Sequence, residues 1–158
     1  MTLLDKARAG QNALEQIANA IPGYQGYRDR EQRRDADRLE REHLAGRLET
    51  GKKALNDAAA AATRSGSLDA INDIETARKR LDGLIARIRH ADRGYSGFFD
   101  TVKVDEATLA RVYEFDLGLL DDVEGIAASG GDAKAMTARI DALDARLADR
   151  SAILSGLK

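Results

Sequence analysis

The sequence predicts an all-α protein, an elongated antiparallel helical bundle of four main helices plus a C-terminal fifth helix. Apolar residues recur at spacings of three and four through every long window, as on amphipathic helices. Alanine, leucine, arginine and the acids dominate the 158 residues, which include one proline. Residues 101–104 alone favour a strand, and this stretch is too short and isolated to form a sheet.

The first two helices are separated by a proline. We expect one helix from Leu3 to Ala20, with apolar residues on one face, and Pro22 followed by Gly23 ends it. The second helix is expected from about Arg28 to Thr63. Its apolar positions are leucines, followed by an alanine run at residues 58–62.

The third helix is expected from about Leu68 to Ala91, after a tight reversal at Gly66 and a cap at Ser67. Its apolar seam contains one arginine: Ile71, Ile74, Arg78, Leu81, Ile85 and Ile88. Residues 92–104 are expected to form an ordered loop.

The fourth helix is expected from about Glu106 to Ala128, and its seam contains one aspartate: Leu109, Val112, Asp116, Leu119, Val123 and Ile126. A glycine-containing break at residues 129–132 precedes the C-terminal helix, expected at residues 132–156, whose heptad spacing suggests self-association. Short connections predict that consecutive helices are antiparallel neighbours.

We expect residues 1–158 to form a single domain with a possible internal duplication. The two proposed copies are about residues 3–66 and 68–128, which leaves the C-terminal helix outside the repeat, and an offset of 71 residues relates their equivalent positions. The offset superposes several apolar positions and two copies of the pattern Gly-Tyr-x-Gly-aromatic. The alternative is that amphipathic helices align with one another without common ancestry.

These two patterns, at residues 23–27 and 94–98, each follow a predicted helix and form two aromatic corners. Odd-numbered helices of an alternating bundle end on the same side, so the corners are predicted to meet there. Glycine closes a helix and rings fill the end of a core, which makes packing the expected role. A docking surface for a protein partner is the alternative. The candidate residues are Tyr24, Tyr27, Tyr95, Phe98 and Phe99.

Arg78 and Asp116 each place a charge at a position that helical periodicity assigns to the core. An unpaired buried charge costs several kcal/mol, roughly 3–5 when a partner is missing. We therefore predict a core ion pair between Arg78 and Asp116, direct or through one neighbouring group. The alternative is that Arg78 reaches the surface and Asp116 lies at the margin of its seam.

No enzymatic site is predicted. Glu40 and His43 have the Glu-x-x-His spacing of di-iron bundles, but the further ligands that such a site needs are missing. The sequence contains no phosphate-binding glycine loop and no nucleophile elbow. We predict no catalytic residue, metal, cofactor or small-molecule substrate.

The charges do not indicate nucleic acid as a partner, because 25 basic residues are balanced by 27 acidic ones. In segment 28–47, acids precede arginines by four residues, which is typical of an exposed helix. A peripheral membrane or nucleic-acid-associated protein is the alternative function. The absence of cysteine fits the cytoplasm, and no apolar run reaches the roughly 20 residues of a membrane span.

The stretch Ile21-Pro22-Gly23-Tyr24-Gln25-Gly26-Tyr27-Arg28, continued by Arg30-Glu31 and Arg33-Arg34, resembles a group of uncharacterised bacterial helical proteins. Residues 94–100 and 113–116 add to the likeness. The resemblance implies a bacterial helical module and no particular activity. The function expected from the sequence is a non-enzymatic scaffold or protein-interaction module.

Overall fold

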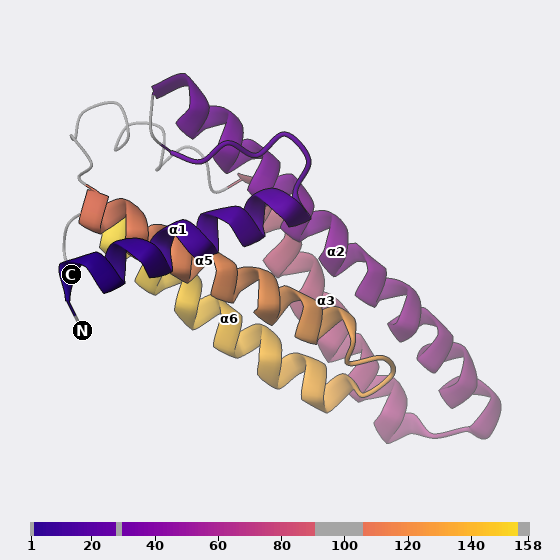
Figure 1. Ribbon diagram of the computed structural model, residues 1–158. Helices are drawn as coiled ribbons and strands as arrows, with labels where there is room; N and C mark the ends of the chain where they lie inside the picture. The colour runs from indigo at the N-terminus through magenta and orange to yellow at the C-terminus, as the bar shows by residue number, and fades with distance from the viewer. Residues whose placement is uncertain (1, 28–29, 91–105, 155–158) are drawn as a thin grey trace.

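The computed structural model describes residues 2–27, 30–90 and 106–154 (Figure 1), and within these ranges it contains helices and turns but no strand. The prediction of an all-α bundle is confirmed. The helices are α1 (Leu3–Ala20), α2 (Arg30–Ser65), α3 (Leu68–His90), α5 (Glu106–Ala127) and α6 (Ala133–Leu154).

Four of these helices form a ring. Helix α2 packs against α3 and α5, and α6 closes the ring by packing against the same two helices. Helix α1 lies outside the ring against α5 (Figure 1). The sequence predicted four main helices plus a C-terminal fifth, but the C-terminal helix belongs to the ring and the N-terminal helix is the additional one.

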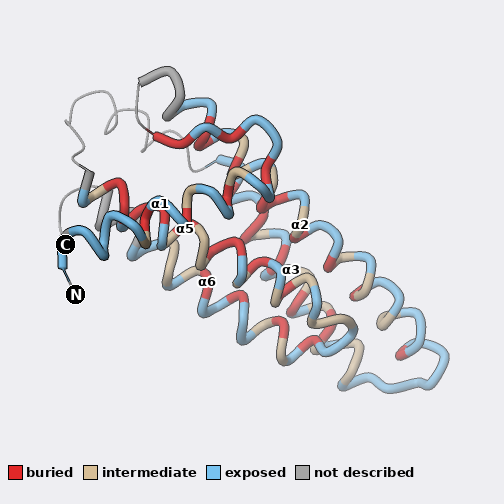
Figure 2. Tube along the Cα trace, viewed as in Figure 1, coloured by how far each residue is buried: buried red, intermediate tan, exposed pale blue. Residues whose placement is uncertain are grey.

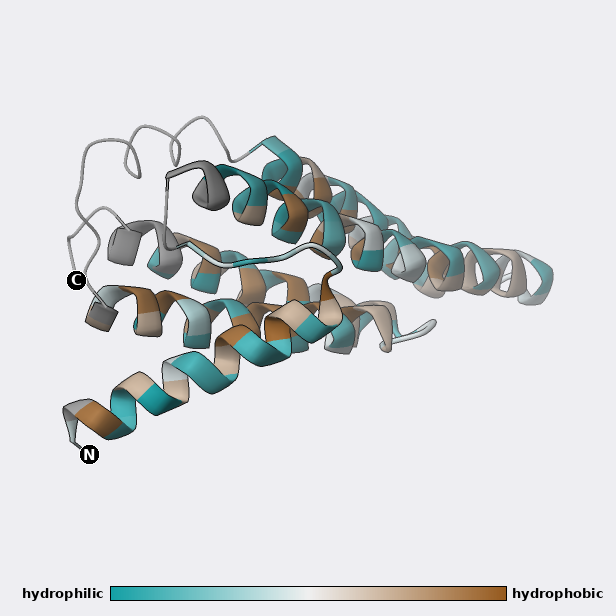
Figure 3. Ribbon diagram, turned by 45° about the horizontal axis from the view of Figure 1, so that its top comes forward, coloured by the Kyte–Doolittle hydropathy of each residue, from teal (hydrophilic) through white to brown (hydrophobic). Residues whose placement is uncertain are grey.

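The expectation that α1 and α2 are antiparallel is wrong. Both run in the same direction, and the chain between them returns along α1 (Figures 1 and 3). Pro22 and Gly23 do end α1, but the following residues continue back far enough for Gly26 to lie beside Leu14. Because the connection returns instead of reversing tightly, the C-termini of α1 and α3 point in opposite directions.

The core lies along the inward faces of the ring, as the buried positions in Figure 2 show. Leucine and isoleucine fill most of it, in agreement with the seams expected from helical periodicity. Charged residues join neighbouring helices at its edges. Lys52 pairs with Asp82 between α2 and α3, and Arg87 pairs with Asp144 between α3 and α6.

Two short turns complete the ring, and each uses a glycine with positive φ. Gly66, at φ 74°, follows α2, and Gly130, at φ 63°, lies between α5 and α6. Left-handed backbone geometry is easily adopted by glycine because it has no Cβ. The Asp132 carboxylate accepts a hydrogen bond from the Ala135 amide and caps α6.

Candidate functional site

The first aromatic corner lies inside the protein, between the returning segment, α2 and α5. Tyr24 is 4% exposed and Tyr27 is 0% exposed. The two rings meet edge to face with centroids 6.0 Å apart, and Tyr27 stacks on Tyr113 of α5 at 5.5 Å. We call Tyr24, Tyr27 and Tyr113 the tyrosine cluster. Such ring pairs contribute about 0.5–1.5 kcal/mol beyond the area that they bury.

The Tyr27 hydroxyl joins two helices through buried carboxylates. It lies 2.8 Å from Oδ2 of Asp116 on α5 and 3.0 Å from Oε2 of Glu40 on α2. Asp116 is 0% exposed and Glu40 is 2% exposed. One phenol carries one proton, so the two carboxylates share a single donor. This contact fixes the position of the returning segment against the ring.

A second hydrogen bond holds the same segment against α5. The backbone N–H of Tyr27 donates to the hydroxyl oxygen of Tyr113 at 2.8 Å. Gly26 makes this approach possible, because a Cβ at this position would lie 2.6 Å from that hydroxyl. Its φ of 86° is also unfavourable for residues with a side chain. The second glycine of the sequence pattern is therefore required by packing and by backbone conformation.

Tyr24 has a different environment from Tyr27. Its hydroxyl is buried and makes no hydrogen bond with the described residues. Burial, followed by the nearby charges of Glu40 and Asp116, raises the pKa of Tyr24 far above its ordinary value. Tyr24 therefore remains a neutral phenol. With both corner tyrosines buried, the arrangement supports the packing interpretation of this corner rather than the docking surface.

The second aromatic corner, with Tyr95, Phe98 and Phe99, lies outside the described residues. Its meeting with the first corner stays a prediction, and the internal duplication is likewise untested. The argument from alternating helices no longer supports the meeting, because α1 and α3 end in opposite directions (Figure 1).

The predicted ion pair between Arg78 and Asp116 does not form. Arg78, with a side chain 32% exposed, donates to Glu75 on its own helix and to Asn56 on α2. Asp116 instead accepts a hydrogen bond from the Tyr27 hydroxyl in the core. The physical reason is side-chain length: arginine extends from a core seam to the surface, whereas aspartate is too short to do so.

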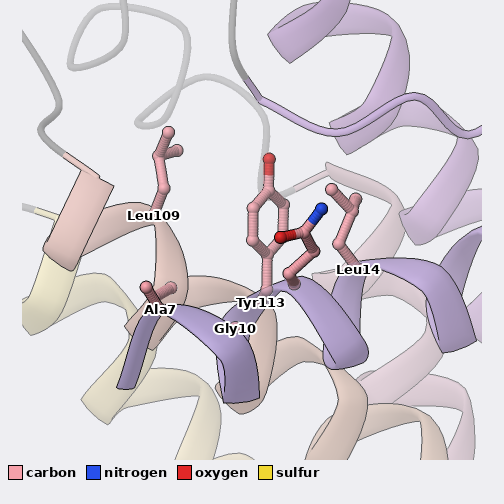
Figure 4. Close-up of a pocket in the computed structure, with 7 residues that line it drawn as sticks. Ala7, Gly10, Leu14, Leu109 and Tyr113 are labelled. Carbon is pink, nitrogen blue, oxygen red and sulfur yellow. The ribbon is translucent and has the colours of Figure 1, made fainter. Parts of the chain in front are cut away.

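A shallow pocket lies where α1 crosses α5 (Figure 4). Tyr113 rises between Leu109 and Leu14, and Gly10 forms part of the α1 wall. The volume is about 70 Å³, far below the roughly 300–1,000 Å³ of small-molecule sites. This pocket has room for water but not for a substrate of ordinary size.

His43 of α2 is a further titratable group, and its side chain is half-buried. Burial lowers its pKa from the ordinary value, and the nearby Glu124 carboxylate partly opposes this effect. Glu124 itself pairs with Arg47 across α2 and α5, and that contact lowers the pKa of Glu124. Among the described residues, no three His, Cys, Asp or Glu side chains are grouped closely enough to bind a metal ion.

The sequence identified Tyr27 and Asp116 but did not connect them, and it did not assign Glu40 or Tyr113 to the same site. One signal was present, since Tyr113 and Asp116 are three residues apart and share one face of α5. For Glu40 the sequence offered no such signal, because it lies in the most highly charged segment of the chain.

Comparison of the chain with protein-family models, with curated proteins and with solved structures found no match. Within the described ranges, none of the helices combines the length and apolar character needed to cross a membrane.

Proposed function

We propose that this protein is a non-enzymatic helical module of the cytoplasm that binds proteins, including a second copy of itself. The main supporting observation is the position of two exposed leucines among the described residues. Leu4 is 61% exposed near the start of α1, and Leu68 is 74% exposed at the turn between α2 and α3. Covering an exposed leucine with another protein is favourable by roughly 1.5–3 kcal/mol, because it removes apolar surface from water.

The pairing of the arginines favours a protein partner over nucleic acid. Among the described residues, most of the ion pairs between helices join an arginine to an acid. Pairs of this kind are Arg47–Glu124, Arg80–Asp141, Arg87–Asp144, Arg89–Glu49 and Arg146–Asp122. Binding to phosphates requires basic groups that are not already neutralised, since its affinity arises from release of counterions.

Site-specific crosslinking in the native host tests the proposal. A photoreactive amino acid replaces Leu4 or Leu68, and matched controls carry it at the exposed positions Gln16 of α1 and Lys79 of α3. We expect protein adducts at position 4 or 68 and none at the controls. The purified protein is also tested with anionic liposomes and with DNA over a range of salt concentrations. Binding to either, without protein adducts, would favour the alternative function and contradict the proposal.

A further inference from the structure

The N-terminal part of the chain lies outside a ring that closes without it. We call residues 2–27 the arm, which consists of α1 and the segment that returns along α1 (Figures 1 and 3). Each of the four ring helices packs against two others of the ring, whereas the main contact of α1 is with α5 alone. A four-helix bundle buries its core between its own helices. Removing the arm therefore leaves every contact between ring helices in place.

The charges of the arm do not attach it to the ring. Among the described residues, the ion pairs between helices join ring helices to each other. The charged residues of the arm are Asp5, Lys6, Arg8 and Glu15. Within the described chain, none of these four side chains forms an ion pair with the ring. The charged contacts that hold the ring together therefore remain when the arm leaves it.

The apolar contacts of the arm lie in its later part. Ala13, Ile17 and Ile21 are at most 2% exposed. The described side chains at positions 2 and 4–8 are all exposed, so α1 docks on the ring from about Gly10 onwards. In proteins, most helical stability comes from the packing of an apolar face. We therefore expect α1 to lose its helical hydrogen bonds when it leaves α5.

The polar contacts of Tyr27 can be exchanged for contacts with water. Its backbone N–H donates to Tyr113, and its hydroxyl lies against the carboxylates of Glu40 and Asp116. A hydrogen bond that is replaced by one to water contributes little net free energy compared with its strength in isolation. Opening also returns both carboxylates to water, which offsets part of the cost of exposing the apolar residues.

We propose that the arm is a strap that opens from the ring and closes on it while the four ring helices stay folded. Residues 10–27 leave the ring as one unit, and Tyr113, Glu40 and Asp116 then become accessible to solvent. Local opening of this kind is expected where a segment has few neighbouring elements. The inference goes beyond the proposed function, because opening of the strap requires no partner.

Hydrogen exchange of the purified full chain, followed by NMR at single amides, tests the strap. When reclosing is faster than exchange, the protection of an amide measures the free energy of the opening that exposes it. We expect the amides of residues 13–20 and the Tyr27 amide to share one protection factor, since the Tyr27 N–H donates across the contact between arm and ring. This factor should be at least about tenfold below that of the most protected ring amides.

Two variants that each remove one methyl group separate opening of the strap from global unfolding. Ile17 belongs to the arm and Ile140 to α6, and both are at most 1% exposed. Ile140→Val weakens the ring equally with the strap open or closed. It should therefore speed exchange of the ring amides about 2–10-fold and leave the arm amides unchanged. Ile17→Val weakens the closed strap, so it should speed exchange of both sets, because global unfolding also releases the arm.

The proposal is overturned if the arm amides are as protected as the ring amides, or if Ile140→Val speeds exchange of both sets equally. In either case the arm leaves only when the whole chain unfolds. It is also overturned if the Tyr27 amide keeps the protection of the ring while α1 exchanges faster, because α1 then frays and the returning segment stays bound. Unchanged exchange of the arm amides in Ile17→Val would show that opening does not separate Ile17 from the ring, which contradicts the strap as well.

Discussion

The hydroxyl of Tyr27 should stabilise the fold by an amount that a single substitution can measure. Tyr27→Phe keeps the buried ring and its stacking on Tyr113, and removes the donor shared by Glu40 and Asp116. A hydrogen bond to a charged group contributes about 1.5–3 kcal/mol. Because the phenol has one proton, we count one such bond and expect a loss of about 2 kcal/mol. For a chain of this length, Tm should fall by roughly 4–8 °C.

Tyr24→Phe is the matched control for this measurement. It also removes a buried hydroxyl from the tyrosine cluster, but this hydroxyl makes no hydrogen bond with the described residues. We expect its free energy of unfolding to remain within about 0.5 kcal/mol of the native value, since no bond is lost. Urea denaturation followed by far-UV circular dichroism gives both values. Equal effects of the two substitutions would refute the role assigned to the Tyr27 hydroxyl.

Two further predictions concern close packing and pH. Gly10→Ala should destabilise the protein by about 1–3 kcal/mol, because its Cβ would clash with the backbone of Ala110. Gly46→Ala should instead stabilise α2 by about 0.5–1 kcal/mol, because the space around Gly46 is open. Thermal denaturation shows whether each substitution lowers or raises Tm. A lower Tm for both variants would contradict the packing described for Gly10 and Gly46. Burial lowers the pKa of His43 below 6.5, so the unfolded chain binds the proton more readily and stability falls as pH drops below this value. Urea denaturation at about pH 7.5 and about pH 5.5 measures how much the free energy of unfolding decreases between the two. This decrease should be smaller for His43→Gln than for the native chain. An equal decrease in both would exclude His43 as its source.

Helical period was sufficient to predict the class of the fold and most element boundaries. Pro22, Gly66 and Gly130 lie at or beside the ends of helices, and each acts through backbone conformation, which is a local property. The direction of α1 is not local. The connection after α1 could either reverse or run back along it, and the choice depends on contacts of Gly26 with Leu14 and Tyr113. These contacts join residues far apart in sequence, so periodicity could not reveal them.

The candidate site was predicted in part for the same reason. The aromatic pattern indicated that Tyr24 and Tyr27 fill a core, and their burial agrees with this interpretation. Glu40 lies among arginines and acids, in a segment whose charge pattern is typical of a solvent-exposed helix. Its burial follows from the returning segment covering α2, and a charge pattern along one helix contains no information about which segment covers it.

Arg78 and Asp116 show how charged side chains of different length behave at equivalent seam positions. The long side chain of Arg78 leaves the seam and finds Glu75 and Asn56 at the surface, so the core needs no polar partner for it. The side chain of Asp116 is too short to reach the surface, so its carboxylate needs a hydrogen-bond donor inside the core. The Tyr27 hydroxyl is that donor. In a chain without tryptophan, a buried tyrosine can bring a hydroxyl into an apolar core on a large ring that also fills space. A short acid in a helical seam therefore points to an aromatic hydroxyl nearby more directly than to an arginine on another seam.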